Sequence, residues 1–208
     1  MNIETYGAFV IATIILMLIP GPTVLLVISY ALAKGRSIAL AVVGGAVIGV
    51  LLSMVATLLG VGLILVTSKT LFIIMKWIGV AYLAWMGWKM IGTSGTTSNQ
   101  ISNATEETHF SAFRDSMIVT FFNPKSIGFF VVFVPQFVNT STPLIPQFVI
   151  MIITFVGIGA INTFAYAMLA AQIRHAFTRP SSLIWMQRIG GVILILLAIY
   201  SALLSYNF

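Results

Sequence analysis

Long apolar stretches alternate along the chain with short polar segments, and this pattern predicts membrane-spanning helices. The uncharged stretches include residues 7–33, 38–68, 126–173 and 189–208. A helix rises about 1.5 Å per residue, so about 20 residues cross the ~30 Å hydrocarbon core of a bilayer. The pattern therefore predicts six spans, near residues 6–33, 38–66, 71–91, 112–138, 144–171 and 184–205.

The composition is typical of a membrane protein. Of the 208 residues, 60% are hydrophobic and 7% are charged, and the mean hydropathy is +1.10. A soluble domain carries roughly 25% charged residues. The segment before the first span has Glu4 and no basic residue, and its apolar run is too long for a signal peptide, so we interpret it as a retained span.

Positive charge is concentrated on one side of the predicted spans. Seven of the ten Lys and Arg residues lie in or beside the loops after spans one, three and five, two lie on the opposite side, and Lys125 lies inside span four. The positive-inside rule then predicts that both termini are periplasmic. The basic residues form no stripe with interleaved aromatics, so the net charge of +6 does not predict nucleic-acid binding.

The chain divides into two predicted halves of one membrane domain, residues 1–208. Residues 93–111 are rich in Ser, Thr, Asn and Gly, which predicts a cytoplasmic linker between a first half, 1–92, and a second half, 112–208. Because each half holds an odd number of spans, the second is inverted relative to the first. The predicted fold is an all-α integral membrane protein with six transmembrane helices in two inverted three-helix repeats.

Prolines interrupt the first span of each half. The breaks are Pro20-Gly21-Pro22 in span one and Asn123-Pro124 in span four. Proline removes a backbone hydrogen bond that no water replaces inside a bilayer. Paired breaks in corresponding spans point to the binding site of a secondary transporter. The predicted depths, about 15–21 Å from the span ends at 1.5 Å per residue, place both breaks near the midplane.

Lys125 follows the second break and is the most informative single residue. A lysine at the midplane costs at least ~2.5–3.5 kcal/mol on insertion scales, and no predicted span has a central carboxylate to pair with it. The remaining partners are a ligand, helix N-terminal amides and backbone carbonyls. An amino-acid carboxylate fits the ammonium and the amides, and the prolines free carbonyls for a substrate ammonium at Leu16, Leu18 and Thr120. The structural alternative is a lysine that snorkels or bonds carbonyls permanently.

Polar residues of span five add candidates to this site. Asn162 and Tyr166 are four residues apart and share a helix face, where they either line the path or bond across helices. The chain has no Cys, no mid-span His and no mid-span carboxylate, so no catalytic residue, metal site or cofactor is predicted. The predicted substrate-binding residues are Pro20, Gly21, Pro22, Thr23, Asn123, Pro124, Lys125, Asn162 and Tyr166.

A pair of glycines in span two predicts close helix packing. Gly45 and Gly49 form a GxxxG motif, which lets two helix backbones approach closely. The partner helix can belong to the same protomer or to a second one, so the motif also allows a homodimer.

At several of these motifs the chain resembles the lysine-exporter superfamily, in its homoserine/threonine-efflux branch. The resemblance covers nearly the whole chain, and its motifs are Pro20-Gly21-Pro22, residues 76–87, Asn123-Pro124-Lys125, Phe129-Phe130 and Pro135-Gln136-Phe137. It implies a secondary active exporter of amino acids or close derivatives in the bacterial inner membrane. It also implies proton antiport, and the paired breaks predict alternating access, in which the two halves rock about the substrate. The expected partners are lipid, protons and a small amino acid.

Two departures from the family pattern bear on coupling and substrate. Thr23 stands where members often have Asp or Asn, and Asn162 is the nearest match to an acidic residue of span five. Proton coupling then falls to Lys125, to an edge acid such as Asp115 or Glu4, or to the substrate. Without a mid-span acid, small neutral or apolar amino acids are expected. The alternatives are a channel or a non-transporting scaffold subunit.

Overall fold

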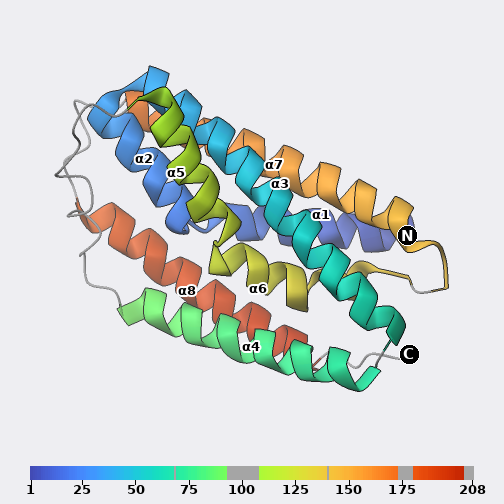
Figure 1. The fold of residues 1–208 in the computed structure, drawn as a ribbon. Helices are drawn as coiled ribbons and strands as arrows, with labels where there is room; N and C mark the ends of the chain where they lie inside the picture. Colours follow the sequence, from blue (N-terminus) through green and yellow to red (C-terminus); the bar gives the residue numbers. More distant parts are fainter. Residues whose placement is uncertain (68, 93–107, 140, 173–179, 204–208) are drawn as a thin grey trace.

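The computed structural model describes residues 1–67, 69–92, 108–139, 141–172 and 180–203, and every regular element in these ranges is helical (Figure 1). In chain order the elements are α1 (Ile3–Leu18), α2 (Pro22–Lys34), α3 (Arg36–Thr67), α4 (Lys69–Gly92), α5 (His109–Phe121), α6 (Pro124–Val132), the 3-10 helix η2 (Val134–Phe137), α7 (Leu144–Gln172) and α8 (Pro180–Leu203).

Both predicted breaks are confirmed. Between α1 and α2 the chain bends by 48°, and between α5 and α6 it leaves the helical conformation at Phe122 and Asn123. Pro22 and Pro124 each begin the next helix, where the missing N–H is not needed and the fixed φ suits the first turn. The Asn123 side chain caps α6 by accepting from the Lys125 backbone N–H at 3.0 Å. Local proline chemistry therefore explains why each apolar stretch becomes two helices.

Each of the six predicted segments coincides with one helix or one broken pair. Within the described residues, three segments are long and apolar enough to cross a bilayer, namely 36–60, 109–137 and 144–172, and the bent α1–α2 pair is a fourth if it counts as one span. The predicted 93–111 linker extends too far, because Thr108 caps α5 and residues 109–111 are already helical. The rest of that linker lies outside the described residues.

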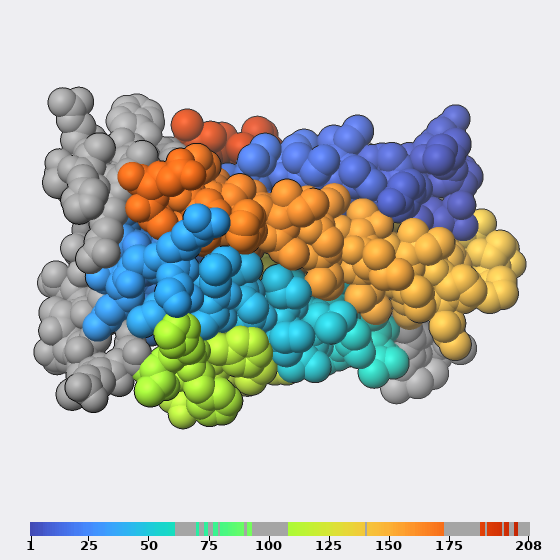
Figure 2. Space-filling view, turned by 90° about the horizontal axis from the view of Figure 1, so that it is seen from above, coloured from blue at the N-terminus to red at the C-terminus, as the bar shows by residue number. Residues whose placement is uncertain are grey.

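The helices form an elongated bundle with both breaks near its middle (Figure 1). α3 packs against α5 and α7, whereas α4 packs mainly against α8 and α6. On the face seen in Figure 2, α7 lies between α1 and α3. Many large apolar side chains on α1, α3 and α7 are exposed, such as Ile11, Leu52 and Ile153. Such an apolar exterior is suited to lipid.

Glycines set the closest helix contacts. A Cβ on Gly45 or Gly49 would overlap the α5 backbone at Phe113 and Met117, so the GxxxG face packs within the protomer and offers no support for a homodimer. α4 and α8 meet in the same way: a Cβ on Gly87 would lie 2.6 Å from the Gly191 carbonyl oxygen, and one on Gly191 would lie 2.5 Å from that of Gly87. Close packing of backbones is the usual reason for small residues between membrane helices.

We expect Gly49→Ala to destabilise the protein, because its Cβ would force α3 and α5 apart. Overpacking costs about 1–3 kcal/mol, equivalent to a fall in melting temperature of about 3–10 °C for a chain of this size. The matched control is Gly157→Ala on α7, where a Cβ would have no neighbour within 4 Å. Thermal unfolding in detergent measures both variants, and an equal shift for the two would contradict the proposed α3–α5 contact.

Candidate functional site

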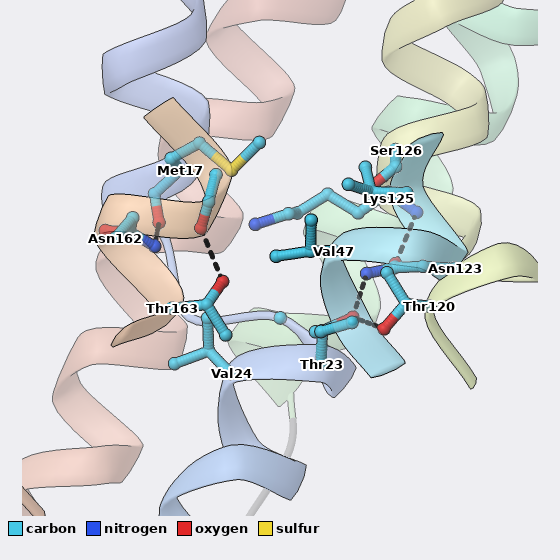
Figure 3. A pocket seen from close by; sticks show the side chains of 14 residues that line it. Met17, Thr23, Val24, Val47, Thr120, Asn123, Lys125, Ser126, Asn162 and Thr163 are labelled. Atoms are coloured by element: carbon cyan, nitrogen blue, oxygen red, sulfur yellow. Dashed lines mark hydrogen bonds between the residues drawn. The ribbon is translucent and has the colours of Figure 1, made fainter. Parts of the chain in front are cut away.

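A cavity lies where the two breaks meet α3 and α7 (Figure 3). It has about 450 Å³ of empty space, including its opening. The α3 side is an apolar wall, whereas the breaks and α7 contribute most of the polar groups. The lining residues are Met17, Gly21, Thr23, Val24, Ala46, Val47, Val50, Thr120, Asn123, Lys125, Ser126, Gly159, Asn162 and Thr163.

Lys125, in the first turn of α6, extends its ammonium group to the end of α1. Its side chain is only 4% exposed. The Nζ atom donates to the carbonyl oxygen of Ile19 at 2.6 Å and to that of Leu16 at 3.0 Å. Two charge-assisted hydrogen bonds of this kind offset much of the desolvation cost of a buried ammonium. The lysine therefore has backbone carbonyl partners at this depth, as one of the sequence-based alternatives predicted.

Gly21 makes room for the lysine. A Cβ added at this position would lie 3.2 Å from Lys125 Cε and 3.3 Å from Nζ. The backbone of Gly21 is extended, with φ −105° and ψ −173°, so its conformation would admit other residues. The requirement for glycine is therefore one of space beside the ammonium.

The last three carbonyls of α1 and that of its C-cap residue Ile19 each accept a hydrogen bond from a side chain of α6 or α7. Besides the two that Lys125 binds, the Met17 carbonyl accepts from Asn162 Nδ2 at 3.1 Å and the Leu18 carbonyl accepts from the Tyr166 hydroxyl at 3.2 Å. We call these four oxygens the α1 carbonyl cluster; its members are the carbonyl oxygens of Leu16, Met17, Leu18 and Ile19. A helix C-terminus carries partial negative charge, so the cluster is a site for cations and other hydrogen-bond donors.

A second polar network joins the two breaks. Asn123 Nδ2 donates to Thr23 Oγ1 at 3.0 Å, and the Thr23 hydroxyl bonds the Thr120 hydroxyl at 3.1 Å. All three side chains are buried. The network connects the first turn of α2 to the end of α5 and the start of α6, so side-chain hydrogen bonds link the two breaks directly.

The N-terminus of α2 gives the cavity a region of opposite polarity. No side chain caps this helix at Gly21, and Pro22 has no N–H of its own. Thr23 and Val24, the next residues of the first turn, line the cavity. A helix N-terminus carries partial positive charge and attracts anions. The end of α1 and the start of α2 therefore place opposite partial charges beside one cavity.

The structure brings together five of the nine predicted binding residues as cavity lining: Gly21, Thr23, Asn123, Lys125 and Asn162. Tyr166 bonds the α1 carbonyl cluster without being among the lining residues. The three prolines likewise do not line the cavity; they set the helix ends. The binding role of all nine residues stays a prediction.

Sequence reasoning missed much of the lining. Ala46, Val47 and Val50 form the α3 wall, and no feature of the sequence distinguishes them from the other apolar residues of this helix. The prediction that the Thr120 and Leu16 carbonyls are free of backbone partners was wrong, because the Thr120 oxygen accepts from the Asn123 N–H at 3.1 Å and the Leu16 oxygen accepts from the Ile19 N–H at 3.2 Å. Sequence reasoning also did not identify the Ile19 carbonyl, which makes the shortest bond to Lys125. A helix that ends before Pro20 does leave this carbonyl without a helical partner, so the signal was present.

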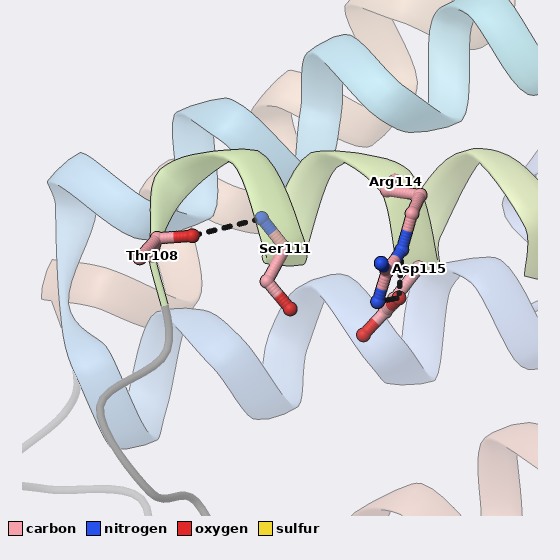
Figure 4. A network of polar contacts seen from close by, with 4 residues as sticks. All are labelled: Thr108, Ser111, Arg114 and Asp115. Carbon is pink, nitrogen blue, oxygen red and sulfur yellow. Dashed lines mark hydrogen bonds and ion pairs between the residues drawn. The ribbon is translucent and has the colours of Figure 1, made fainter.

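The edge acids do not reach the cavity. Asp115 lies near the start of α5 and pairs with the neighbouring Arg114, whose Nη2 donates to its Oδ1 at 3.0 Å (Figure 4). Both side chains are well exposed, and pairs of this kind contribute about 0–1 kcal/mol. Neither Asp115 nor Glu4 is among the residues that line the cavity. The described part of the chain therefore provides no carboxylate at this site.

Apolar helices and a cavity with a few polar groups between two broken helices are typical of a multi-pass membrane transport protein. A family model described as LysE type translocator matches residues 14–205. The chain belongs to this family, which confirms the resemblance to the lysine-exporter superfamily.

Several known proteins are similar in sequence to this chain over most of its length. An uncharacterized membrane protein of Vibrio cholerae is 33% identical over 196 residues, 92% of this chain and 93% of the relative. A leucine efflux protein of Klebsiella pneumoniae is 29% identical over 151 residues, 72% and 71% of the two chains. A homoserine/homoserine lactone efflux protein of Salmonella typhimurium is 27% identical over 183 residues, 88% of each chain. No solved structure matches this chain.

Proposed function

We propose that this protein is a secondary active exporter of small neutral or apolar amino acids or their derivatives. The observation that carries the proposal is the buried ammonium of Lys125, a cavity-lining residue that bonds two carbonyls of the α1 carbonyl cluster and shares the cavity with the first turn of α2. An amino acid is a zwitterion, and this cavity offers complementary groups for both of its charges. The efflux activities named for the relatives agree with export.

The proposed pose follows from the charges. The substrate carboxylate binds the Lys125 ammonium and the first-turn amides of α2, where the positive end of the helix dipole lies. The substrate ammonium lies toward the α1 carbonyl cluster. Its side chain packs on the α3 wall of Ala46, Val47 and Val50. Burial on this wall contributes about 25 cal/mol per Å² of apolar surface, which favours neutral and apolar side chains over charged ones.

Two of the substrates named for the relatives, leucine and homoserine, fit the same pattern. Leucine, homoserine and homoserine lactone all carry a primary amine and none has a charged side chain. The first two also carry a carboxylate. We take the primary amine beside a carboxylate as the group that this protein recognises.

An inverted repeat is part of the proposal. A broken helix, a long helix and a third helix occur in the same order in both halves, as α1–α2, α3 and α4, and again as α5–α6, α7 and α8. The reciprocal contact of Gly87 with Gly191 is the kind of contact expected between two helices related by a pseudo-two-fold axis. With six spans, the charge bias would place both termini in the periplasm of a bacterium and the protein in its inner membrane.

Alternating access would then open the cavity to one side at a time. Toward the end of α6 the chain packs a buried group of aromatic rings, with Phe129 stacked on Phe133 at 5.2 Å and Phe130 edge-on to Phe155 at 4.7 Å. In the proposed topology this group closes the periplasmic side. Lys125 is the one titratable side chain among the lining residues, so we assign proton exchange to it.

Counterflow in proteoliposomes tests this function. We expect vesicles loaded with unlabelled L-leucine or L-homoserine to take up the labelled amino acid, and an imposed pH gradient to change the net flux. Protein-free vesicles are the control. Absence of exchange for every amino acid by folded protein would refute the proposal, and a preference for lysine or arginine would refute the substrate class. A planar-bilayer conductance far above carrier turnover would instead favour a channel.

A further inference from the structure

We propose that the α1 carbonyl cluster is a shared ammonium site, occupied alternately by the Lys125 ammonium and by the ammonium of the substrate. Lys125 holds the cluster when the transporter carries no substrate. When an amino acid enters, its ammonium takes the carbonyls of Leu16 and Ile19, and Lys125 turns to the substrate carboxylate. This inference rests on the proposed function and names the subsite that would recognise the amine.

The chemistry of the cluster favours any primary ammonium group. The four carbonyl oxygens lie at the negative end of the α1 dipole, and Lys125 Nζ bonds two of them, at 2.6 and 3.0 Å. The α-ammonium of an amino acid has the same charge and the same three donors as the lysine ammonium. The side chains of Asn162 and Tyr166, on α7, donate to the other two carbonyls. The two carbonyls that Lys125 binds are therefore the ones that a substrate ammonium can take over.

The proposed exchange requires the Lys125 stem to rotate. Its stem of four methylene groups has several rotatable bonds, and its polar end passes over Gly21, which has no side chain to hold it in one place. In Figure 3 the ammonium group projects into the cavity between the α7 side chains and the Thr23–Asn123 network. A rotation of the stem away from the α1 carbonyl cluster carries Nζ into the same cavity, where a substrate carboxylate would meet it.

Exchange keeps every buried charge paired. A buried ammonium without a partner costs several kcal/mol, so Lys125 can leave the cluster only when another acceptor is available. An amino acid supplies both a replacement ammonium and a carboxylate. A simple amine supplies the first without the second and would leave Lys125 unpaired. Lys125 would therefore reject amines that lack an acceptor, which makes it a determinant of specificity.

The test is the ligand preference of Lys125→Met, measured by calorimetry on purified protein. The probes are L-leucine with 3-methylbutylamine, and L-homoserine with 3-aminopropan-1-ol; each amine is the amino acid without its carboxylate. We expect wild type to bind the amino acid about tenfold or more better than the amine, since one hydrogen bond to a charged group is worth about 1.5–3 kcal/mol. In Lys125→Met the preference inverts, because the carbonyls are free and the lysine is gone. Lys89→Met, at the exposed end of α4, keeps the wild-type preference.

A second measurement needs no substitution at Lys125. In wild type, acetate supplies the missing carboxylate, so it is expected to raise the affinity for 3-methylbutylamine severalfold; acetate and amine that bind independently or in competition would overturn the inference. A folded Lys125→Met protein that binds neither amine, or still prefers the amino acid, would also overturn it. If wild-type protein exchanges no amino acid, the proposed function itself is refuted. If exchange is normal but acetate does not raise the affinity for the amine, only the shared ammonium site is refuted.

Discussion

Lys125→Ala is expected to lower amino-acid exchange by about 30-fold or more, because removing one partner of a buried charge pair costs about 2–5 kcal/mol. The substitution removes the proposed carboxylate partner and both bonds to the α1 carbonyl cluster. Counterflow of labelled L-leucine or L-homoserine in proteoliposomes measures the effect. Exchange at the wild-type rate would refute the carboxylate role of the lysine.

The control for this variant distinguishes the loss of a positive charge in the cavity from the loss of one elsewhere in the protein. Lys89→Ala removes an exposed lysine at the end of α4 and is expected to keep the wild-type exchange rate. Membrane extraction and thermal unfolding of both variants establish that they insert and fold. If Lys125 only supports the fold, Lys125→Ala is expected to lose stability and transport together. If Lys125 binds substrate, Lys125→Ala is expected to lose transport while it remains folded.

A graded series at Gly21 is expected to give the second large effect. Gly21→Ala places a Cβ 3.2–3.4 Å from the end of the Lys125 side chain, which the lysine can accommodate with a small rotation. A displaced rotamer costs about 0.5–1.5 kcal/mol, so exchange is expected to fall about two- to tenfold. Gly21→Leu adds four carbons in the same space and displaces the ammonium from the carbonyls. A cost at the upper end of the usual overpacking range, about 2–3 kcal/mol, is expected, so exchange falls about 30- to 150-fold.

Backbone strain does not account for such a series, because the extended conformation of Gly21 is open to other residues. Gly157→Leu on α7 is the matched control, since a Cβ there meets nothing within 4 Å. Counterflow measures the three variants side by side. Equal exchange by Gly21→Leu and Gly157→Leu would show that the space beside Lys125 is not needed for transport.

Local chemistry explains the features that were predictable from the sequence. The helix ends at Leu18 and Phe121 follow from Pro20, Pro22 and Pro124, because a proline ring removes a donor and restricts the residue before it. Apolar runs of sufficient length explain the helices themselves. The isolation of Lys125 from carboxylates followed from a count of charges, and the cavity lining agrees with it.

The boundary errors and missed residues have a different origin. The helix start at His109 depends on the Thr108 cap, a local signal that the polar composition around it obscured. The apolar wall of α3 has no local signal at all, because Val47 and Val50 differ from their neighbours only in the direction they face. Asp115, one of the residues predicted as candidates for proton coupling, pairs with Arg114 and does not line the cavity, which depends on how the helices pack.

By itself, then, the sequence determined that the chain forms apolar helices, that two of them break, and that a lysine follows the second break. Only the tertiary structure decided which carbonyls this lysine meets, that Gly49 packs on α5 within one protomer, and that α3 closes the cavity. The features that the sequence determined depend on proline geometry and on the transfer of apolar side chains out of water, which both act within one segment of the chain. The features that the tertiary structure decided depend on contacts between segments as far apart as Lys125 and Leu16, whose separation is set only when the whole bundle packs.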